Sequence, residues 1–590
     1  MKQNKNQLKN IIIKIIKAKP STEKELLDIA RREAGKLKSP PPEKSSLLSA
    51  YRQLLKNKKI RPNINIERLL IKRGVRTLSG VAVISVLTKP QSCPGNCLFC
   101  PTEKNMPKSY LSNEPAVMRA ILNDFDPFRQ VEMRLKALAA NGHATDKIEL
   151  IIMGGTWSAH SPKYQSWFIK RCLDALNAKN SKSLEQAQKK NETAKHRLVG
   201  LTLETRPDYI TKKEIKKMRQ LGCTRVELGV QHIDDKILKL NRRGHTAEQS
   251  IKAIKLLKNA GFKINLHLML NLYGSTPAKD SGMFETIYSD SNWMPDMVKI
   301  YPCVVNENAD LYKLYKQGKY KPYTKKQLLD LIIKIKKITP PWVRITRLIR
   351  DIPEESIVAG NKTTNLRQLI GEQATKDGWQ CKCIRCREAG HQLNCHPEEP
   401  RLMSGRRGDL AGLPRSSAQG GLPRNDIKLK KIKYKASDGT EYFLSYESPD
   451  KRVLYAFLRL RLNVILNKAK RSEGSQVMPR NPSPEFTLSE VEGTQDDIYK
   501  TFPELQNAAL IREVHTYGQL AELGKIGEVQ HLGLGKKLIA EAEKIAQKEF
   551  KKTCPECSRK IVVISGIGVR EYYKKLGYRL EGTYMVKYLK

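Results

Sequence analysis

Three cysteines stand close together in the segment Cys93-Pro-Gly-Asn-Cys97-Leu-Phe-Cys100, where their thiolates share one short loop. Three thiolates can ligate three irons of a four-iron four-sulfur cluster and leave the fourth iron open to a chelating molecule. A structural zinc site is the alternative, but zinc in such sites takes four ligands, and no fourth Cys or His lies within reach in sequence. The spacing therefore favours an iron–sulfur cluster.

The cysteine loop resembles that of the radical SAM enzymes, in which the open iron binds the amino and carboxylate groups of S-adenosylmethionine. Electron transfer then cleaves a sulfur–carbon bond of that molecule and gives an adenosyl radical. Phe99, directly before the last cysteine, also fits this family.

Further candidate site residues follow apolar runs that predict strands. The run Gly154-Gly155-Thr156 could offer backbone groups to the methionine end of the cofactor, although a Gly-Gly pair after a strand is often only a turn. Glu204 and Arg206, at the end of the next strand, are candidates for the same site; with Asp208 they place three charged side chains at one rim, and a structural ion pair among them is the alternative. Lys299, which we place at the end of a later strand, is a candidate catalytic residue that could contact RNA or a substrate carboxyl group.

A scaffold of alternating strands and helices is predicted to position these residues. Short β-branched runs within residues 76–365 predict strands at Val81–Leu87, Ile148–Met153, Leu198–Leu203, Val226–Val230, Ile264–Met269, Val298–Val304 and Val343–Leu348. Helix-period segments between them imply parallel strands joined by right-handed crossovers. We therefore expect an α/β TIM-like barrel, complete or partial, with its active site at the carboxyl ends of the strands.

The length and charge of the chain allow for additional domains and an anionic partner. The 590 residues carry a formal net charge of +48, and residues 1–75 hold 20 Lys and Arg against six Asp and Glu. We expect a small basic helical region there that grips nucleic acid, although a uniformly basic surface is the alternative. The apolar run Ile11–Ile16 is too short for a membrane span. We expect no membrane segment or targeting signal, and the clustered cysteines favour metal binding in the cytoplasm.

Two polar segments interrupt the second half of the chain. Residues 392–426 are rich in Pro, Gly, Arg and Ser and predict a disordered insertion, and the polar residues 472–497 predict a surface loop. The remainder of residues 427–590 predicts an α+β domain. Its expected elements are strands at Tyr442–Tyr446, Val453–Leu460, Leu510–Thr516 and Ile561–Ser565, and a long helix at Lys536–Phe550.

Taken together, many segments resemble the catalytic subunit of Elongator and its archaeal and bacterial relatives, which are tRNA uridine acetyl- or carboxymethyltransferases. Besides the cysteine loop, they are Arg76–Val83, Ser109-Tyr110, Glu114–Ala120, Met153–Thr156, Leu203–Tyr209, Arg225–Gln231, Lys299–Pro302, Arg350–Pro353 and Cys381–Cys386. The resemblance implies that the adenosyl radical abstracts hydrogen from the methyl group of acetyl-CoA. The carbon radical then adds to a wobble uracil in the anticodon loop, and hydrolysis leaves a carboxymethyl group. It also implies tRNA as partner, with a homodimer or accessory subunits as open questions.

The segment from Gln530 through Gly533-Leu-Gly535-Lys536 runs into the long predicted helix and resembles the pyrophosphate-binding turn of GNAT acetyltransferases. A helix amino terminus offers amide donors to an anion, and glycines let the backbone come close. Tyr572 and Tyr573 begin the last helix, and the resemblance implies that one of them faces the acetyl-CoA thioester while the other packs in the core. His515 could be a base, but a core histidine is favoured.

Two further groups of cysteines lie closer to the carboxyl terminus than the first cysteine loop. Cys381, Cys383 and Cys386 resemble the zinc-binding linker of the family, placed at residues 366–391, and the fourth ligand is unidentified. His391, Cys395 and His396 are nearby, but the last two lie in or beside the insertion, so His391 or a residue of the barrel is preferred. The pair Cys554 and Cys557 is interpreted as a loop feature rather than a site.

Two other functions remain open from the sequence. A protein lysine acetyltransferase would need only the GNAT domain, with the cluster serving a structural role. A non-catalytic tRNA-binding scaffold would explain the two insertions and the short connection between His515 and Gln530.

Overall fold

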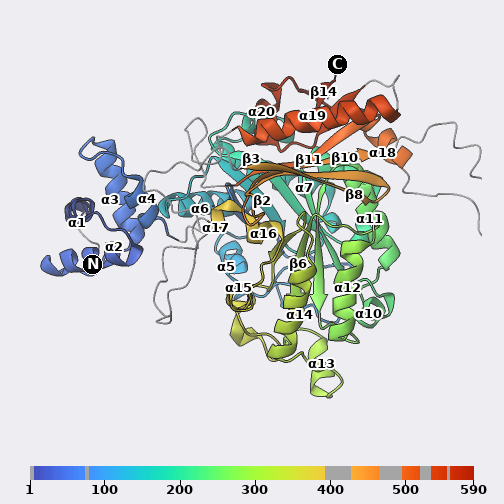
Figure 1. Ribbon diagram of the computed structural model, residues 1–590. Helices are drawn as coiled ribbons and strands as arrows, with labels where there is room; N and C mark the ends of the chain where they lie inside the picture. The colour runs from blue at the N-terminus through green and yellow to red at the C-terminus, as the bar shows by residue number, and fades with distance from the viewer. Residues whose placement is uncertain are drawn as a thin grey trace, which may run out of the picture.

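The computed structural model describes residues 5–72, 77, 79–392, 427–463, 495–517, 533–553 and 559–589. A helical unit, a sheet of parallel strands and a second, mixed sheet follow one another along the chain (Figure 1). Of the predicted insertion at 392–426, all but Gln392 lies outside the described residues, as does most of the predicted loop at 472–497. The end of that loop is corrected, because helix α18 (Gln495–Thr501) already begins within it.

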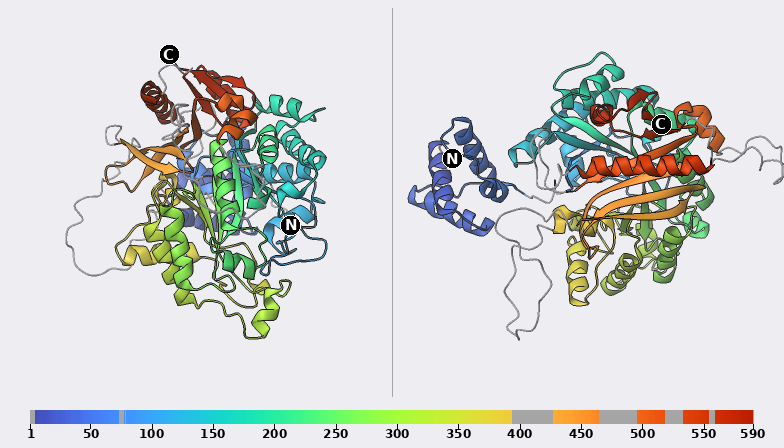
Figure 2. Two further views of the ribbon diagram at one scale, coloured as in Figure 1. Left: turned by 90° about the vertical axis from the view of Figure 1, so that its right-hand side faces the viewer. Right: turned by 45° about the horizontal axis from the view of Figure 1, so that its top comes forward.

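Four amphipathic helices at the start of the chain pack around a core of their own. They are α1 (Lys5–Ala18), α2 (Glu23–Lys36), α3 (Lys44–Lys56) and α4 (Ile64–Leu70). Apolar residues at helical spacing, among them Ile12, Leu26 and Tyr51, form one buried cluster. This unit stands to one side of the two sheets (Figure 2), and Arg52 donates a hydrogen bond of 2.6 Å to the carbonyl oxygen of Ala139 at the end of α6.

Seven parallel strands are hydrogen-bonded in chain order from β1 to β7. They are β1 (Ala82–Leu87), β2 (Lys147–Met153), β3 (Arg197–Thr205), β4 (Arg225–Gln231), β5 (Lys263–Leu270), β6 (Met297–Pro302) and β7 (Arg344–Arg347). Each overlaps a strand predicted from the sequence. In the described chain β1 and β7 do not pair with each other, so the sheet is a partial barrel whose carboxyl ends share one rim.

Helices connect the strands of this barrel. They are α5 (Pro115–Ile121), α6 (Pro127–Ala140), α7 (Pro162–Asn177), α8 (Leu184–Asn191), α9 (Lys212–Gln220), α10 (Asp235–Leu240), α11 (Ala247–Asn259), α12 (Pro277–Ser289), α13 (Leu311–Lys316) and α14 (Lys325–Ile338). Side-chain caps fix several starts; Ser161 accepts from the Tyr164 N–H at α7, and Thr246 forms a capping box with Gln249 at α11. Within the described ranges, none of the helices combines the length and apolar character needed to span a membrane.

The chain leaves β7 through three short helices and then builds the second sheet. The helices are α15 (Leu366–Lys376), α16 (Ile384–Arg387) and α17 (Ala389–Gln392). The sheet has the order β13-β14-β12-β11-β10-β9-β8. Its strands are β8 (Lys428–Ala436), β9 (Gly439–Glu447), β10 (Leu454–Asn463), β11 (Ala508–Thr516), β12 (Lys560–Val563), β13 (Arg579–Glu581) and β14 (Tyr584–Tyr588).

The second sheet is mixed, as an α+β domain requires. β11 and β12 run parallel, and the other neighbouring strands in the described sheet are antiparallel. Helix α19 (Leu534–Thr553) contacts β10 and β11, and α20 (Arg570–Lys574) precedes β13. The sequence predicted β9 to β12 and α19 but not β8, β13 or β14, because β8 is a Lys-rich edge strand and β13 spans only three residues.

Buried charges join the second sheet to the amino-terminal side of the barrel. Asp296, which precedes β6, accepts hydrogen bonds of 2.5 and 3.0 Å from Arg512 of β11, and Arg512 also pairs with Glu441 of β9 at 3.0 Å. Arg459 of β10 donates to Glu513 at 3.0 Å and to the carbonyl oxygen of Asp296 at 3.2 Å. Burial would raise the pKa of Asp296, but Arg512 and Arg459 outweigh it and hold that pKa far below its usual value. Separating the sheets would therefore break the ion pairs that compensate these charges.

Candidate functional site

A cavity of about 490 Å³ runs through the lumen of the barrel. On the carboxyl side of the strands it reaches Phe99 of the cysteine loop, and on the amino side it reaches Ser79 and Arg344. His515 of the second sheet places Nε2 2.6 Å from the carbonyl oxygen of Ser79, and its ring packs 4.4 Å from that of Tyr517. The cavity thus extends from the cysteine loop to the boundary with the second sheet.

Charged side chains from four adjacent strands meet in the middle of this cavity. His267 of β5 lies between two carboxylates, with Nε2 3.0 Å from Glu227 Oε2 and Nδ1 3.3 Å from Glu204 Oε1. Lys299 of β6 forms an ion pair with Glu227, and the hydroxyl of Tyr110 donates to Glu204 at 3.3 Å. We call Glu204, Glu227, His267 and Lys299 the lumen network.

The lumen network keeps both of its carboxylates ionised. Burial would raise the pKa of Glu227, but Lys299 and His267 outweigh it, and the pKa lies well below its usual value. For Glu204, burial is likewise outweighed by His267 and Lys299, and the pKa is lowered. The predicted position of Lys299 is corrected here, because it stands in the middle of β6 rather than at its end.

The cysteine loop is held against the turn that follows α10. The backbone N–H of Leu98 donates to the carbonyl oxygen of Asn241 at 3.1 Å. Two residues later in that turn, Arg243 places Nη1 3.0 Å from Cys97 Sγ. The turn therefore fixes the middle cysteine both through the backbone and through a cationic side chain.

The three loop sulfurs do not lie within 4.8 Å of one another as a group, as ligands of a single metal ion would. Cys93 Sγ lies 3.6 Å from Thr156 Oγ1, and burial raises the pKa of Cys100 to about 11. Among the described residues, the one group of three potential ligands whose atoms all lie within 4.8 Å of one another is elsewhere, in the linker. Wider spacing fits a cluster, because each thiolate then binds a different iron.

The Gly-Gly turn after β2 comes close to this loop. Gly154 and Gly155 have φ values of 128° and 94°, which are unfavourable for other residues. A Cβ on Gly154 would collide with the hydroxyl of Thr88, whereas at Gly155 the nearest atom is the carbonyl oxygen of Lys108 at 3.5 Å. The turn needs glycine for its geometry and also carries Thr156 to Cys93.

Arg206 forms the ion pair that the sequence offered as the alternative to a cofactor contact. Its Nε and Nη2 donate to the two carboxylate oxygens of Asp208, each at 2.9 Å. Its Nη1 is buried without a partner among the described residues and faces Gly95, where a Cβ would collide with it. Oε1 of Gln231 is also buried and has no hydrogen-bond partner among the described residues. Such atoms are costly to leave unpaired, so these two polar atoms near the cysteine loop fit a polar ligand such as S-adenosylmethionine.

A second candidate site lies where β11 and β12 separate. The two strands pair up to Ile511 and Val563, and β11 then continues to Thr516 without β12. Gly533 precedes α19, and Gly535 and Lys536 lie in its first turn. Gln530 lies outside the described residues.

The two tyrosines of α20 have different environments. A Cβ on Gly535 would lie 3.5 Å from the hydroxyl of Tyr572, which therefore stands over the amino end of α19. Tyr572 is 36% exposed, whereas Tyr573 is 6% exposed and packs its ring 5.7 Å from that of Tyr578. Of the pair, Tyr572 is the one that can reach a ligand, and both lie in the interior of α20 rather than at its start.

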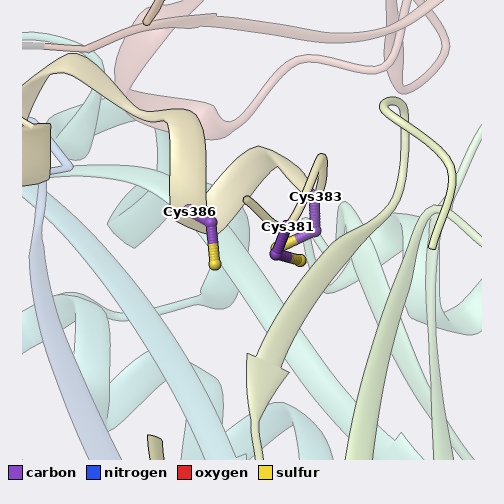
Figure 3. Close-up of side chains that lie close together, drawn as sticks. All are labelled: Cys381, Cys383 and Cys386. Carbon is purple, nitrogen blue, oxygen red and sulfur yellow. The ribbon is translucent and has the colours of Figure 1, made fainter. Parts of the chain in front are cut away.

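The linker cysteines converge, as Figure 3 shows for Cys381, Cys383 and Cys386. Their sulfurs all lie within 4.8 Å of one another, which is close enough for one metal ion. Lys336 Nζ lies 3.4 Å from Cys386 Sγ. The described residues add no fourth Cys, His, Asp or Glu to the group, and the side chain of His391 lies outside them.

Sequence reasoning missed three residues that the structure brings to these sites. Glu227 and His267 lie in the lumen network, and Arg243 contacts Cys97. A signal existed for His267, because it and Asn265 interrupt an apolar strand at alternate positions and must share one face. Arg243 had no such signal, since its contact joins positions 146 residues apart.

Comparison with known proteins first defines the class. A family model described as the radical SAM superfamily matches residues 88–284, and one described as the radical SAM C-terminal domain matches residues 295–376. The first range contains the cysteine loop and the second contains Lys299 and β7. The chain is a radical SAM protein, and that class implies a four-iron four-sulfur cluster and S-adenosylmethionine.

Individual relatives then define the family. The tRNA uridine(34) acetyltransferase of Methanocaldococcus infernus is 46% identical over 533 residues, which cover 88% of each chain. Human Elongator complex protein 3 is 35% identical over 531 residues, which cover 88% of this chain and 86% of the human one. A solved structure of M. infernus Elp3 with an N-terminal deletion aligns with a TM-score of 0.66 at 42% identity, covering 87% of this chain and 100% of that one. The chain belongs to the family of tRNA uridine(34) acetyltransferases and Elongator complex protein 3, as the sequence resemblance indicated.

Proposed function

We propose that this chain modifies the wobble uridine of tRNA, using an adenosyl radical and acetyl-CoA to install a carboxymethyl group. The relatives at 46% and 40% identity are named tRNA uridine(34) acetyltransferases, which supports uridine 34 as the target. The observation that carries the proposal is the lumen cavity, which is open to the cysteine loop at one end and to the boundary with the second sheet at the other. A radical source and an acyl donor could therefore act on one enclosed space.

The barrel residues have distinct roles in this proposal. Cys93, Cys97 and Cys100 hold the four-iron four-sulfur cluster, and the turn Gly154-Gly155-Thr156 with Arg206 holds S-adenosylmethionine. When bound, these groups supply an adenosyl radical. The lumen network lines the path to the substrate: Glu204 and Glu227 accept hydrogen bonds as carboxylates, and Lys299 neutralises one of them, so the cavity presents both donors and acceptors to a uracil ring.

The second sheet is proposed to be the GNAT acetyltransferase domain. Parallel strands that separate, with a helix beginning in the opening, would leave backbone amides free for the pyrophosphate of acetyl-CoA at Gly533, Gly535 and Lys536. Gln530, three residues before Gly533 in the sequence, is proposed to bind the same group. Tyr572 stands at this helix end, and burial raises its pKa, so its hydroxyl keeps its proton at neutral pH. It can donate a hydrogen bond to a thioester there, whereas Tyr573 supports the fold.

The amino-terminal helices and the linker are proposed to bind tRNA and a metal ion, respectively. The basic helices of residues 5–70 are proposed to grip tRNA phosphates, which predicts binding that weakens with salt. The linker cysteines are proposed to hold a structural zinc ion, because three thiolates within 4.8 Å suit a tetrahedral site that lacks one ligand. The name of the human relative refers to a complex, and accessory subunits are therefore proposed here too.

The product 5'-deoxyadenosine gives the test of this function. The reduced, cluster-loaded protein is incubated with S-adenosylmethionine, acetyl-CoA and tRNA, and 5'-deoxyadenosine is quantified. We expect its formation, and its loss in a Cys97→Ala variant. A protein lysine acetyltransferase would make none, and a tRNA-binding scaffold would bind tRNA without turning over acetyl-CoA.

A further inference from the structure

The turn after α10 carries two adjacent arginines that point to different partners. Arg242 forms an ion pair of 2.9 Å with Asp310, and both side chains are substantially exposed. Arg243 is buried; its Nη1 lies 3.0 Å from Cys97 Sγ, and its Nη2 donates to the carbonyl oxygen of Gly229 in β4. The guanidinium of Arg243 therefore bridges the cysteine loop and a barrel strand.

Arg243 lacks the partner that a buried cation normally has. Among the described residues no carboxylate pairs with it, although burying an unpaired charge is costly. Cys97 Sγ is the one sulfur it contacts, and as a thiolate it would supply the missing negative charge.

A second guanidinium lies on the same loop. Asp208 clamps Arg206 by two hydrogen bonds and leaves its Nη1 buried, unpartnered and facing Gly95, two residues before Cys97. A Cβ on Gly244, next to Arg243, would lie 3.3 Å from Nη2 of Arg206, so the two arginines are close neighbours. Their side chains place two guanidinium groups beside one short loop; that of Arg206 is paired with Asp208 and turns its Nη1 toward the loop, whereas that of Arg243 has no carboxylate partner among the described residues.

We infer that Arg243, assisted by Arg206, is a positioning residue that raises the reduction potential of the cluster held by Cys93, Cys97 and Cys100. This inference rests on the proposed function in one respect, that these cysteines hold an iron–sulfur cluster. Adding an electron makes the cluster more negative, and a nearby cation with an N–H···S hydrogen bond stabilises that form. Arg243 would therefore make the electron transfer that cleaves S-adenosylmethionine easier to drive.

The test compares three variants of the full-length protein, loaded with iron and sulfide without oxygen. Arg243→Gln removes the charge, Arg243→Lys keeps the charge but loses the two-pronged contact, and Arg242→Gln is the matched control in the same turn. Iron content is determined first, and the midpoint potential is then measured by a redox titration monitored by electron paramagnetic resonance. We expect the potential to shift to more negative values in Arg243→Gln, to a smaller extent in Arg243→Lys, and not at all in Arg242→Gln.

The outcomes separate the inference from the proposed function. An Arg243→Gln protein with full iron content and an unchanged potential overturns the inference while the cluster stands. If Arg243→Gln takes up no iron, Arg243→Lys decides: a loaded cluster with a lowered potential supports the inference, and loss of iron from both variants overturns it in favour of a purely structural role. If the wild-type protein itself takes up no iron, the proposed function fails.

Discussion

Two buried carboxylates on adjacent strands are paired with basic side chains from the next two strands in the barrel lumen. Glu204, Glu227, His267 and Lys299 come from β3, β4, β5 and β6, and each touches a neighbour of opposite or complementary character. Their side chains would be costly to bury singly, and they are stable in the lumen because each has a partner. The residues that line the cavity are therefore also residues on which the barrel depends.

Replacing Glu227 by Gln should destabilise the protein markedly. Lys299 would keep its charge but lose its carboxylate while remaining largely buried. Breaking one partner of a buried pair costs about 3–5 kcal/mol, and we expect a loss of this order in the free energy of unfolding measured with urea. Asp330→Asn, in the exposed pair with Lys326, should cost no more than about 0.5 kcal/mol. Equal, small losses in both variants would contradict the role of the network.

Removing the hydroxyl of Tyr572 should affect acetyl-CoA turnover and not folding. Tyr572→Phe deletes the donor over the amino end of α19, and loss of a positioned donor costs roughly 10²-fold or more in rate. Tyr573→Phe is the matched control, because that ring packs in the core. The rate of CoA release in the presence of tRNA checks both, and a larger loss for Tyr573→Phe would reverse the assignment.

Turns between elements bring the candidate groups to the cysteine loop. The Gly-Gly turn after β2 and the turn after α10 both meet this loop, one through Thr156 and the other through Asn241 and Arg243. The backbone conformation of such a turn matters as much as its side chains, because it sets the direction in which the chain leaves the strand or helix.

A side chain at Gly154 should disturb this arrangement. Gly154→Ala adds a Cβ at a φ of 128° that would collide with Thr88, and such strain costs of order 1–3 kcal/mol. We expect a lower melting temperature and weaker binding of S-adenosylmethionine by isothermal titration. Gly371→Ala, in α15 with open space around it, should instead be neutral or stabilise by roughly 0.5–1 kcal/mol. Unchanged binding in Gly154→Ala would count against the cofactor role of the turn.

The strands of the barrel were predictable from sequence because buried parallel strands leave runs that are largely apolar, as at Ile148–Met153 and Ile264–Met269. The cysteine loop was equally visible, since its ligands lie within eight residues of one another. Arg243 and the pairing of Glu227 with Lys299 were not, because they depend on contacts between elements distant in the chain. Likewise, Tyr572 and Tyr573 are adjacent in sequence, and packing alone distinguishes them.

Paired, buried charges and a shared apolar cluster hold the two sheets together. Arg512 and Arg459 of the second sheet reach Asp296 of the barrel, and Lys258 of α11 lies at the same boundary. The lumen cavity opens toward this boundary, so the arrangement of the sheets also fixes the relation between the two candidate sites.

The boundary should respond to pH through Lys258. Burial lowers the pKa of this amine to about 7, although Asp296 and Glu441 oppose the shift. The unfolded chain therefore binds more protons than the folded chain from about pH 7 upward to the usual lysine pKa, and the contribution of Lys258 to stability rises with pH in that window. We measure the free energy of unfolding of the wild type minus that of Lys258→Met, and we expect this difference to increase between pH 7 and pH 9. A difference that stays constant or shrinks would contradict this assignment.

The fate of the acetyl carbons tests most directly whether radical and acyl chemistry share one cavity. Acetyl-CoA labelled with carbon-13 in both acetyl carbons is supplied with S-adenosylmethionine, reductant and tRNA, and the nucleosides are analysed by mass spectrometry. The account predicts a carboxymethyl uridine two mass units heavier than the unlabelled product, and none with Cys97→Ala. A modified uridine without the label, or an undiminished yield from Cys97→Ala, would contradict it.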